Sequence, residues 1–247
     1  MRYFGGKERI AKELAVFINQ MYLSGNNKSF YDLFCGSCNI LTKVDSNRDR
    51  YGNDRHKYLI AMWEEMQKGW IPPTECTKEQ YDLVKQKMDI KPYVSGFIGF
   101  GCSFSGKWWG GFAKSKENRN YCLNAHNSSI KKMKNLMDVS FSNKDYSEVR
   151  MCEGSVVYCD IPYKNTTQYS VKEVDVFDHD KFYDWCIKNK DKYTILVSEY
   201  EHNVPNGFEV VWRKNSKQDI RSKDGKQKET VEVLMTPVRE EIYGRID

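Results

Sequence analysis

The chain has 247 residues, 40% of them hydrophobic and 30% charged, with a formal net charge of +5. This length predicts one large domain, or one domain with a smaller insert, and the composition argues against a disordered chain. No run of about 18 apolar residues occurs and the stretch MRYFGGKERIAKEL lacks the apolar middle of a signal peptide, so we expect a cytoplasmic protein without a membrane segment.

The first part of the chain alternates between helix and strand patterns. Apolar residues recur at three- and four-residue steps over 8–23, which predicts a helix. Short strands are predicted at 30–34 and around 50–52, followed by a helix at about 57–67. Residues 69–125 interrupt this alternation with prolines, a helix predicted at 77–88 and the Gly- and aromatic-rich stretch YVSGFIGFGCSFSGKWWGGFAK. We interpret 69–125 as an insert.

Alternation resumes after the insert. A helix near 127–137, a strand at 138–142, the strand VVYC at 156–159, a helix near 178–190 and the strand TILVSEY are predicted in turn. FEVVWR and ETVEVLM are typical of an antiparallel hairpin with a basic loop between its strands. The alternation predicts an α/β sheet with helices on both faces, and such sheets bind ligands beyond the carboxyl ends of their strands.

A glycine turn follows the first predicted strand, in DLFCGSCN. Gly36 would let the backbone approach a nucleoside cofactor closely. Asp54 follows Gly36 by 18 positions (54 − 36), close to the spacing of about 20 at which an acidic residue binds ribose hydroxyls. An ordinary strand and turn with a surface aspartate explains these residues equally well, and the three-glycine dinucleotide fingerprint is absent.

Three other stretches contain residues suited to binding or catalysis. In YFGGK, Lys7 and backbone amides at a helix start could hold a carboxylate, although a plain helix start is the simpler interpretation. GFGCSFSGKWWGGF suits backbone contacts and base stacking, or the packing of the insert. In DIPY, a carboxylate and a carbonyl beside an aromatic face can accept hydrogen bonds from an amino group on a planar ring; the alternative is a strand end with a turn proline.

Basic residues form two clusters. Between Lys107 and Lys134 seven basic residues stand against a single glutamate, and a second cluster, RKNSKQDIRSKDGKQK, follows at 213–228. Two such clusters favour a polyanionic partner. Cys35 and Cys38 have C-x-x-C spacing, but the second pair or spaced histidines of a zinc site do not accompany them. We expect free thiols and no metal site.

Taken in order, these stretches resemble the Dam-type (D12 class) DNA adenine N6-methyltransferases. The resemblance covers nearly the whole chain and is strongest at 1–60 and 140–165. It implies a Rossmann-like α/β methyltransferase sheet that uses S-adenosylmethionine, with a catalytic domain at 1–68 and 126–247. Residues 69–125 would form an inserted, mainly helical target-recognition region. The implied activity is site-specific transfer of a methyl group to a flipped adenine in double-stranded DNA.

The resemblance also implies site residues. The catalytic tetrapeptide falls on Asp160, Ile161, Pro162 and Tyr163, where Tyr163 would stack on the target base. Positions that contact the cofactor fall on Tyr3, Lys7, Asp32, Phe34, Gly36, Ser37, Asp54, Asp145 and Asp160. The DNA contacts expected in the insert are Lys107, Trp108, Lys114, Lys116 and Arg119. We expect a monomer or a weak dimer.

Two residues depart from the family pattern. Ile161 replaces the first proline of the usual Asp-Pro-Pro-Tyr, and Cys38 replaces a glycine of the cofactor turn. They motivate one alternative, a catalytically degenerate relative that only binds DNA. The other alternative is a cytosine N4-methyltransferase, which would use the same acceptor pair on a smaller ring.

Overall fold

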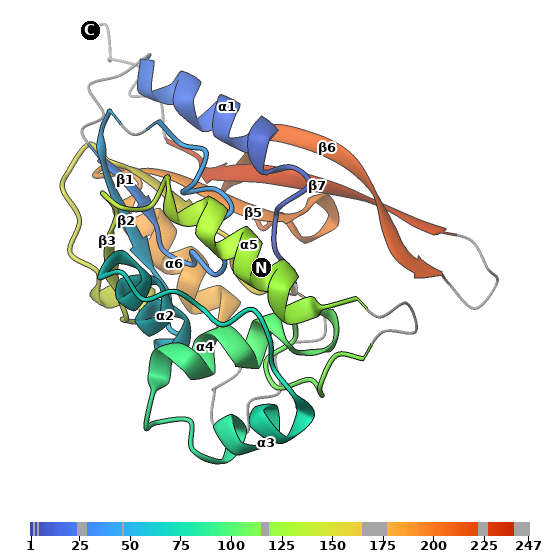
Figure 1. The fold of residues 1–247 in the computed structure, drawn as a ribbon. Helices are drawn as coiled ribbons and strands as arrows, with labels where there is room; N and C mark the ends of the chain where they lie inside the picture. Colours follow the sequence, from blue (N-terminus) through green and yellow to red (C-terminus); the bar gives the residue numbers. More distant parts are fainter. Residues whose placement is uncertain are drawn as a thin grey trace, which may run out of the picture.

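A seven-stranded sheet forms the centre of the protein (Figure 1). The computed structural model describes residues 1–247 except 2, 4, 24–28, 46, 115–118, 165–176, 222–226 and 240–247, and it leaves the side chains of 22–23, 216–221 and 227–229 undescribed. The strands are β1 (Ser29–Asp32), β2 (Asp49–Asn53), β3 (Ser140–Ser142), β4 (Val156–Cys159), β5 (Thr194–Tyr200), β6 (Phe208–Arg221) and β7 (Gln227–Pro237). The helices are α1 (Ala11–Leu23), α2 (Lys57–Gln67), α3 (Lys78–Gln86), α4 (Pro92–Gly101), α5 (Tyr121–Met133) and α6 (His179–Asn189), with short 3-10 turns η1 (Phe104–Gly106), η2 (Tyr146–Glu148) and η3 (Glu201–Asn203).

The strand order is β3-β2-β1-β4-β5-β7-β6. The point at which this order changes direction lies between β1 and β4. Strands β3, β2, β1, β4 and β5 pair in parallel, while β7 runs antiparallel to both β5 and β6. Because β1 lies between β2 and β4, the carboxyl ends of these three strands meet at one edge, which is where open α/β sheets bind ligands. The predicted Rossmann-like α/β sheet is confirmed.

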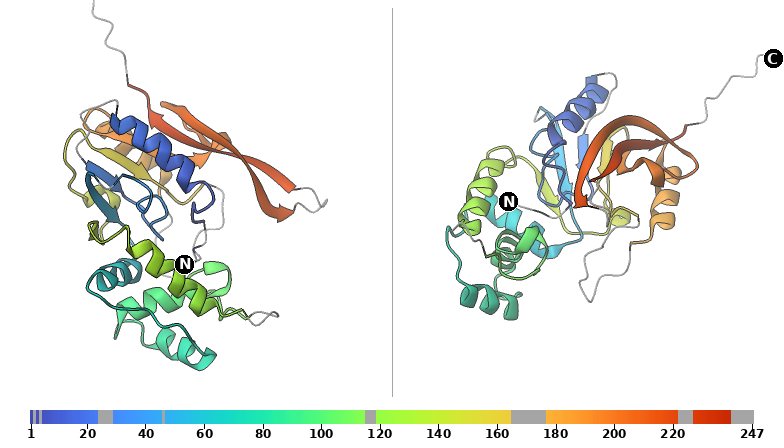
Figure 2. Two further views of the ribbon diagram at one scale, coloured as in Figure 1. Left: turned by 45° about the horizontal axis from the view of Figure 1, so that its top comes forward. Right: turned by 90° about the vertical axis from the view of Figure 1, so that its right-hand side faces the viewer.

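Alternate residues of the strands supply two separate cores. Phe30, Val156 and Tyr158 face a core shared with α1, α2, α4 and α5, whereas Tyr31 and Val157 face a second core shared with α6. This period of two is what a sheet covered on both faces requires. Figure 2 shows α6 on the opposite side of the sheet from α4 and α5. Among the described residues, the helices are too short or too polar for any of them to cross a bilayer.

Two predictions of local structure need correction. The helix predicted near 127–137 begins at Tyr121 and ends at Met133, because the Asn120 side chain accepts a hydrogen bond from the Leu123 N–H and caps an earlier start. The Gly-rich stretch 92–101, which carried no helix prediction, forms α4 with Pro92 in its first turn. The predicted helix at 57–67 and strand at 156–159 are confirmed, and the predicted antiparallel hairpin is longer than expected.

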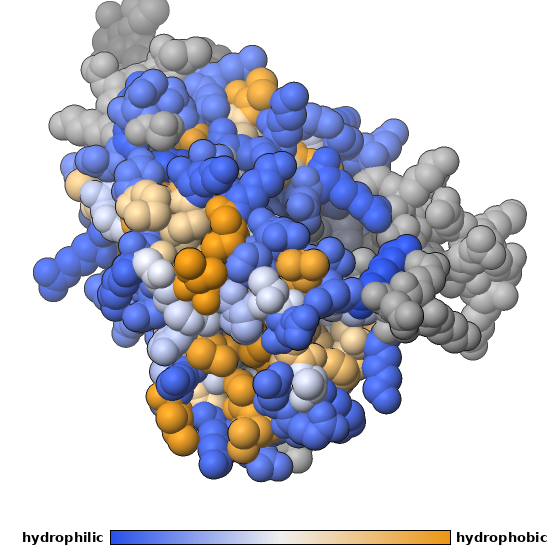
Figure 3. Space-filling view, in the orientation of Figure 1, coloured by the Kyte–Doolittle hydropathy of each residue, from blue (hydrophilic) through white to orange (hydrophobic). Residues whose placement is uncertain are grey.

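The segment 69–125 gathers α3, α4 and η1 at one end of the molecule (Figure 1). Apolar surface collects at this end of the face shown in Figure 3, and the segment exposes Ile71, Leu83 and Ile90. Helix α5 continues across residue 125, where the insert was predicted to end. Helix α4 packs so closely on α2 that an added Cβ at Gly96 would lie 2.0 Å from the Tyr58 carbonyl oxygen.

This close approach gives a stability prediction. Gly96→Ala should destabilise the protein by about 2–3 kcal/mol, because the methyl group meets backbone that cannot rotate away. The matched control is Gly154→Ala, where the added Cβ has open space but φ is +77°. That change should cost about 1 kcal/mol. Urea unfolding measures both; a Gly96→Ala protein as stable as the parent would contradict the packing of α4 on α2.

Candidate active site

The ammonium group of Lys7 lies at the centre of the candidate site. Its Nζ is 3.1 Å from an Asp160 carboxylate oxygen, 3.6 Å from a Glu232 oxygen and 4.1 Å from the centre of the Tyr163 ring. The residue is 8% exposed. Burial lowers the pKa of Lys7, but Asp160 and Glu232 outweigh it and raise the pKa above its usual value. Lys7 therefore stays charged within the site.

Asp160 follows β4 directly, at the carboxyl edge of the sheet. Its side chain is 20% exposed, so the carboxylate is largely enclosed. Burial raises the pKa of Asp160, and Lys7 opposes that shift. The lysine thus favours the ionised carboxylate, the form with full hydrogen-bond acceptor capacity.

In the rest of the predicted tetrapeptide, Ile161 and Tyr163 are buried and Pro162 is exposed. Ile161 is buried in the core shared with α6, so its side chain fills space that a proline would leave. The Pro162 carbonyl is 2.8 Å from His179 Nε2. The Tyr163 ring is 9% exposed, with Lys7 over one face and Tyr200 at 4.6 Å in an edge contact. A base that stacks on Tyr163 must therefore use the face opposite Lys7 or displace the ammonium.

The turn after β1 brings several predicted cofactor residues together. Gly36 has φ +46°, and a Cβ there would lie 3.0 Å from the Tyr3 ring. Only glycine accommodates both the left-handed backbone and the ring so close to it. The Gly36 carbonyl accepts a hydrogen bond from Trp63 Nε1, and the Ser37 carbonyl accepts one from Lys132 Nζ at 2.7 Å. These two hydrogen bonds fix the position of the turn at the carboxyl edge of the sheet.

Cys38 adopts a left-handed conformation with φ +57°. This is the position where the family pattern has glycine, so the structure explains the usual residue: an L-residue here is strained by about 1–2 kcal/mol. The thiol is fully buried, 3.8 Å from the Gly36 carbonyl, and packs in the core. With cysteine at this position the turn keeps its left-handed backbone. The side chain adds apolar contacts that a glycine would lack.

Asp54 is fixed by backbone donors at the end of β2. One carboxylate oxygen accepts from the Gly36 N–H and the other from the His56 N–H, both at 2.8 Å. Each oxygen keeps a lone pair for a further donor, such as a ribose hydroxyl. Burial raises the pKa of Asp54 to about 6, although these two hydrogen bonds lower it and Asp160 adds to the increase.

Asp32 completes an acidic edge with Asp54 and Asp160. Asp32 is 2% exposed, and burial followed by the charge on Asp160 raises its pKa well above the usual value. The charge on Asp160 raises the pKa of both Asp32 and Asp54, so this edge is a region of negative potential. That potential suits a ligand with a positive centre and hydroxyl groups, so the residues fit S-adenosylmethionine, whose sulfonium is cationic and whose ribose carries hydroxyls.

The remaining predicted cofactor residues lie at the same edge. Phe34 packs against Tyr146, with ring centres 5.9 Å apart, in a cluster of aromatic side chains. Asp145 caps η2 by accepting from the Ser147 N–H. The segment before it is held by Asn53, whose Nδ2 donates to the Lys144 carbonyl at 3.0 Å.

The predicted DNA contacts divide into exposed and packed residues. Lys114 and Arg119 are exposed and Lys107 is half-buried, while Lys116 lies outside the described residues. The Trp108 ring packs 4.3 Å from His56 and stacks on Tyr58 at 5.2 Å, so it forms part of an aromatic cluster between the insert and α2.

Sequence reasoning did not single out Asn53, Glu199 and Glu232 at this edge, nor Phe104 within the stretch GFGCSFSGKWWGGF. Glu199 and Glu232 come from β5 and β7, strands distant from the tetrapeptide along the chain, so no local pattern marks them. Phe104 is 66% exposed at the tip of η1. The tip is braced, because the Phe104 N–H donates to the Gly111 carbonyl at 2.8 Å and Ser105 has φ +57°.

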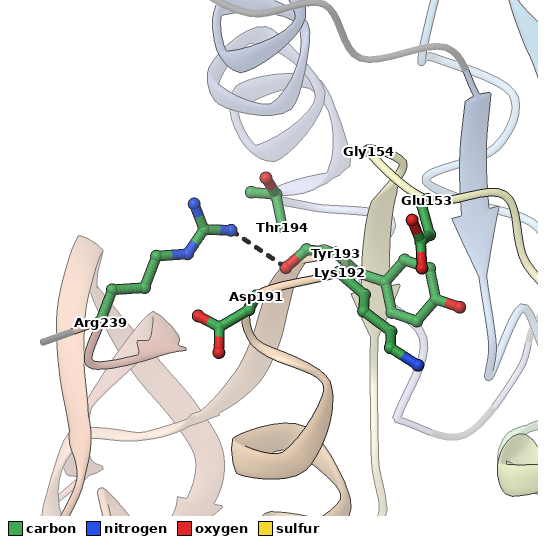
Figure 4. A pocket seen from close by; sticks show the side chains of 7 residues that line it. All are labelled: Glu153, Gly154, Asp191, Lys192, Tyr193, Thr194 and Arg239. Carbon is green, nitrogen blue, oxygen red and sulfur yellow. Dashed lines mark hydrogen bonds between the residues drawn. The ribbon is translucent and has the colours of Figure 1, made fainter.

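A separate pocket lies at the opposite, amino ends of β4 and β5 (Figure 4). It is lined by Glu153, Gly154, Asp191, Lys192, Tyr193, Thr194 and Arg239. Arg239 donates to the Lys190 and Tyr193 carbonyls, which satisfies backbone groups just beyond the end of α6. We therefore assign this pocket a structural role.

Comparison with protein families agrees with the prediction from sequence. Residues 3–95 match the model of the D12 class N6 adenine-specific DNA methyltransferases, which supports the predicted family. The chemistry of that family is transfer of a methyl group from S-adenosylmethionine to the N6 atom of adenine in DNA. No curated protein matches the chain.

Comparison with solved structures gives matches of low sequence identity. One is a candidate RNA methyltransferase from Pyrococcus horikoshii, 10% identical, with a TM-score of 0.40 over 94% of this chain and 85% of that one. Another is described as precorrin 8W decarboxylase from Methanobacterium thermoautotrophicum, 12% identical, with a TM-score of 0.35 over 92% and 90% of the two chains. A third, SMU.472, is a candidate methyltransferase complexed with SAH, 10% identical, with a TM-score of 0.33 over 97% and 56%.

The raised pKa of Asp54 predicts how cofactor affinity depends on pH. Below about pH 6 the carboxyl group gains a proton and loses acceptor capacity, so S-adenosylmethionine affinity should fall by up to about tenfold per pH unit. In Asp54→Asn the affinity should be weak and its pH slope reduced, with Asp32 and Asp160 supplying what remains. Calorimetric titration from pH 8 to pH 5 measures both proteins.

The same shift has the opposite sign for the stability of the ligand-free protein. Because the folded pKa lies above the unfolded value of about 3.9, this group makes the protein less stable as pH rises from about 4 to about 6.

A parent whose cofactor affinity stays constant from pH 8 to pH 5 would show that Asp54 does not bind the cofactor through its carboxylate.

Proposed function

We propose that Asp160 and the Ile161 carbonyl hold the two amino hydrogens of a flipped adenine, and that Lys7 keeps this acceptor pair in its active form. The observation that carries the proposal is the Lys7–Asp160 ion pair of 3.1 Å at the carboxyl end of β4. It joins the YFGGK and DIPY motifs, which lie more than half the chain apart, at one point of the sheet edge.

The acceptor pair would compensate for the poor nucleophilicity of the adenine amino group. The lone pair of the adenine amino nitrogen is delocalised into the ring, so this nitrogen is a poor nucleophile. Two fixed acceptors orient the amino group and stabilise the positive charge that develops on nitrogen as the new N–C bond forms. S-adenosylmethionine supplies an electrophilic methyl group when bound. Asp160 accepts one amino hydrogen and is placed to take the proton that the nitrogen loses.

Residues at the three neighbouring strand ends would hold the cofactor. Asp54 would accept the ribose hydroxyls, and the turn at Gly36 and Ser37 would lie against the methionine part with Tyr3. Phe34 and Asp145 would border the adenine of the cofactor. Asp32 and Asp160 would face its positive centre.

Two alternatives make different predictions. A cytosine N4-methyltransferase would use the same acceptors, but Asp rather than Ser at position 160 and the order of the motifs favour adenine. A relative that only binds DNA was suggested by Ile161 and Cys38. The structure accommodates both residues, since each side chain is buried in a core. Absence of S-adenosylmethionine binding would favour the relative without catalysis.

The segment 69–125 is the proposed target-recognition region. Lys107, Lys114 and Arg119 would contact phosphates, and the exposed ring of Phe104 would meet a base. Lys116 and the basic stretch 213–228 would add phosphate contacts. The described part of that stretch lies in the projecting β6–β7 hairpin (Figure 1). Flipping one base costs a few kcal/mol, which these contacts would offset. We propose a cytoplasmic protein that works as a monomer or weak dimer.

Asp160→Asn tests the acceptor assignment. The change keeps the size of the side chain and one acceptor oxygen but introduces N–H groups, so single-turnover methylation of DNA should fall by about 10³-fold. The Kd for DNA should stay within about threefold of the parent. Asp184→Ala, at an exposed position of α6, is the control and should leave the rate unchanged. A rate for Asp160→Asn within a few fold of the parent would refute the acceptor pair.

Lys107→Ala together with Arg119→Ala tests the DNA-binding surface. Loss of two phosphate contacts should weaken DNA binding and reduce the slope of log K against log salt by about 2. The matched control is Lys181→Ala with Lys188→Ala, two exposed lysines on α6 at the opposite face of the sheet. If the control pair lowers the slope and the insert pair does not, the DNA lies on the other face.

A further inference from the structure

The loop that follows the catalytic tetrapeptide is attached to a buried carboxylate that the mechanism above does not use. Glu199, in the strand TILVSEY, is completely buried. We infer that Glu199 is a positioning residue for the catalytic loop at 160–164, fixing the Ile161 carbonyl and the Tyr163 ring against β5. This inference rests on the proposed function of that loop.

The hydrogen bonds of Glu199 connect the loop to the strand. One carboxylate oxygen accepts from the Lys164 N–H at 3.0 Å, directly after Tyr163. The other accepts from the Tyr200 N–H at 2.7 Å and from Asn203 Nδ2 at 3.0 Å. Asn203 Nδ2 also lies 3.2 Å from the Lys164 carbonyl, so both backbone groups of Lys164 are bonded to this pair.

A second attachment lies on the other side of the tetrapeptide. His179, the first residue of α6, contacts the Pro162 carbonyl at 2.8 Å. Together with β4, which ends at Cys159, these contacts fix the loop at its start, in its middle and at its end. The carbonyl of Ile161 lies between the fixed points. A misplacement of this acceptor by about 1 Å would cost on the order of 10²-fold in rate.

The partners of Glu199 distinguish positioning from core packing. A buried carboxylate is costly unless hydrogen bonds satisfy it, and here one donor is the loop N–H of Lys164, while the others come from the end of β5 and from η3. A carboxylate that joined two rigid elements would contribute only to the stability of the fold. This one joins a strand to the backbone of Lys164, directly after Tyr163, so the position of the end of the loop depends on it.

Glu199→Gln is the informative variant, because it keeps the volume and one acceptor but presents N–H groups to a donor. We expect the single-turnover methylation rate to fall by about 10- to 100-fold, with the Kd values for S-adenosylmethionine and DNA within about threefold of the parent. Asn203→Ala should have a smaller effect in the same direction. The double variant should be about as slow as Glu199→Gln alone, since both changes release the same loop.

Two further measurements separate positioning from lost stability and from failure of the proposed function. Gly154→Ala lowers stability away from the loop and should methylate at the parental rate per folded molecule. Amide hydrogen exchange at Lys164 should be faster in Glu199→Gln whether or not the parent methylates DNA. A parental methylation rate in Glu199→Gln would overturn the inference, as would unchanged exchange at Lys164 or a rate loss accompanied by equal losses of both affinities.

Discussion

The ammonium group of Lys7 is the contact on which the arrangement of the site depends. Burial would discharge a lone lysine and a lone aspartate, and pairing Lys7 with Asp160 and Glu232 keeps them charged. The pair also fixes the N-terminal segment, β4 and β7 relative to one another. The position of the Tyr163 ring follows, since the ammonium lies over its face. One charge therefore sets both the protonation state and the geometry of the acceptor pair.

The order of the strands makes this arrangement possible. The reversal beside β1 brings the ends of β1, β2 and β4 to one edge, and each end supplies one carboxylate: Asp32, Asp54 and Asp160. Mutual repulsion of these groups destabilises the ligand-free edge, and a bound cation would relieve it. Helix α4 then packs on α2 at backbone distance through Gly96, which ties the segment 69–125 to the helix that follows Asp54.

Sequence patterns predicted what depends on local periodicity and on compact motifs. The strand VVYC and the helix at 57–67 follow from patterns within about ten residues, and Asp54 was found from its separation of 18 positions (54 − 36) from Gly36. Glu199 and Glu232 could not be found in this way, because their roles arise from pairing of β5 and β7 beside β4. Helix α4 was not predicted, because glycine disfavours an isolated helix. In this structure glycine permits close packing between helices. The left-handed backbone at Cys38 likewise becomes visible only in three dimensions.

The central claim is that Asp160, held by Lys7, directs methyl transfer to the amino group of adenine. The most direct test is mass spectrometry of nucleosides from the DNA of a methylation-deficient host that expresses the parent or Asp160→Asn. The account predicts N6-methyladenine with the parent and background levels with the variant. N4-methylcytosine with the parent, or equal N6-methyladenine with both proteins, would contradict it.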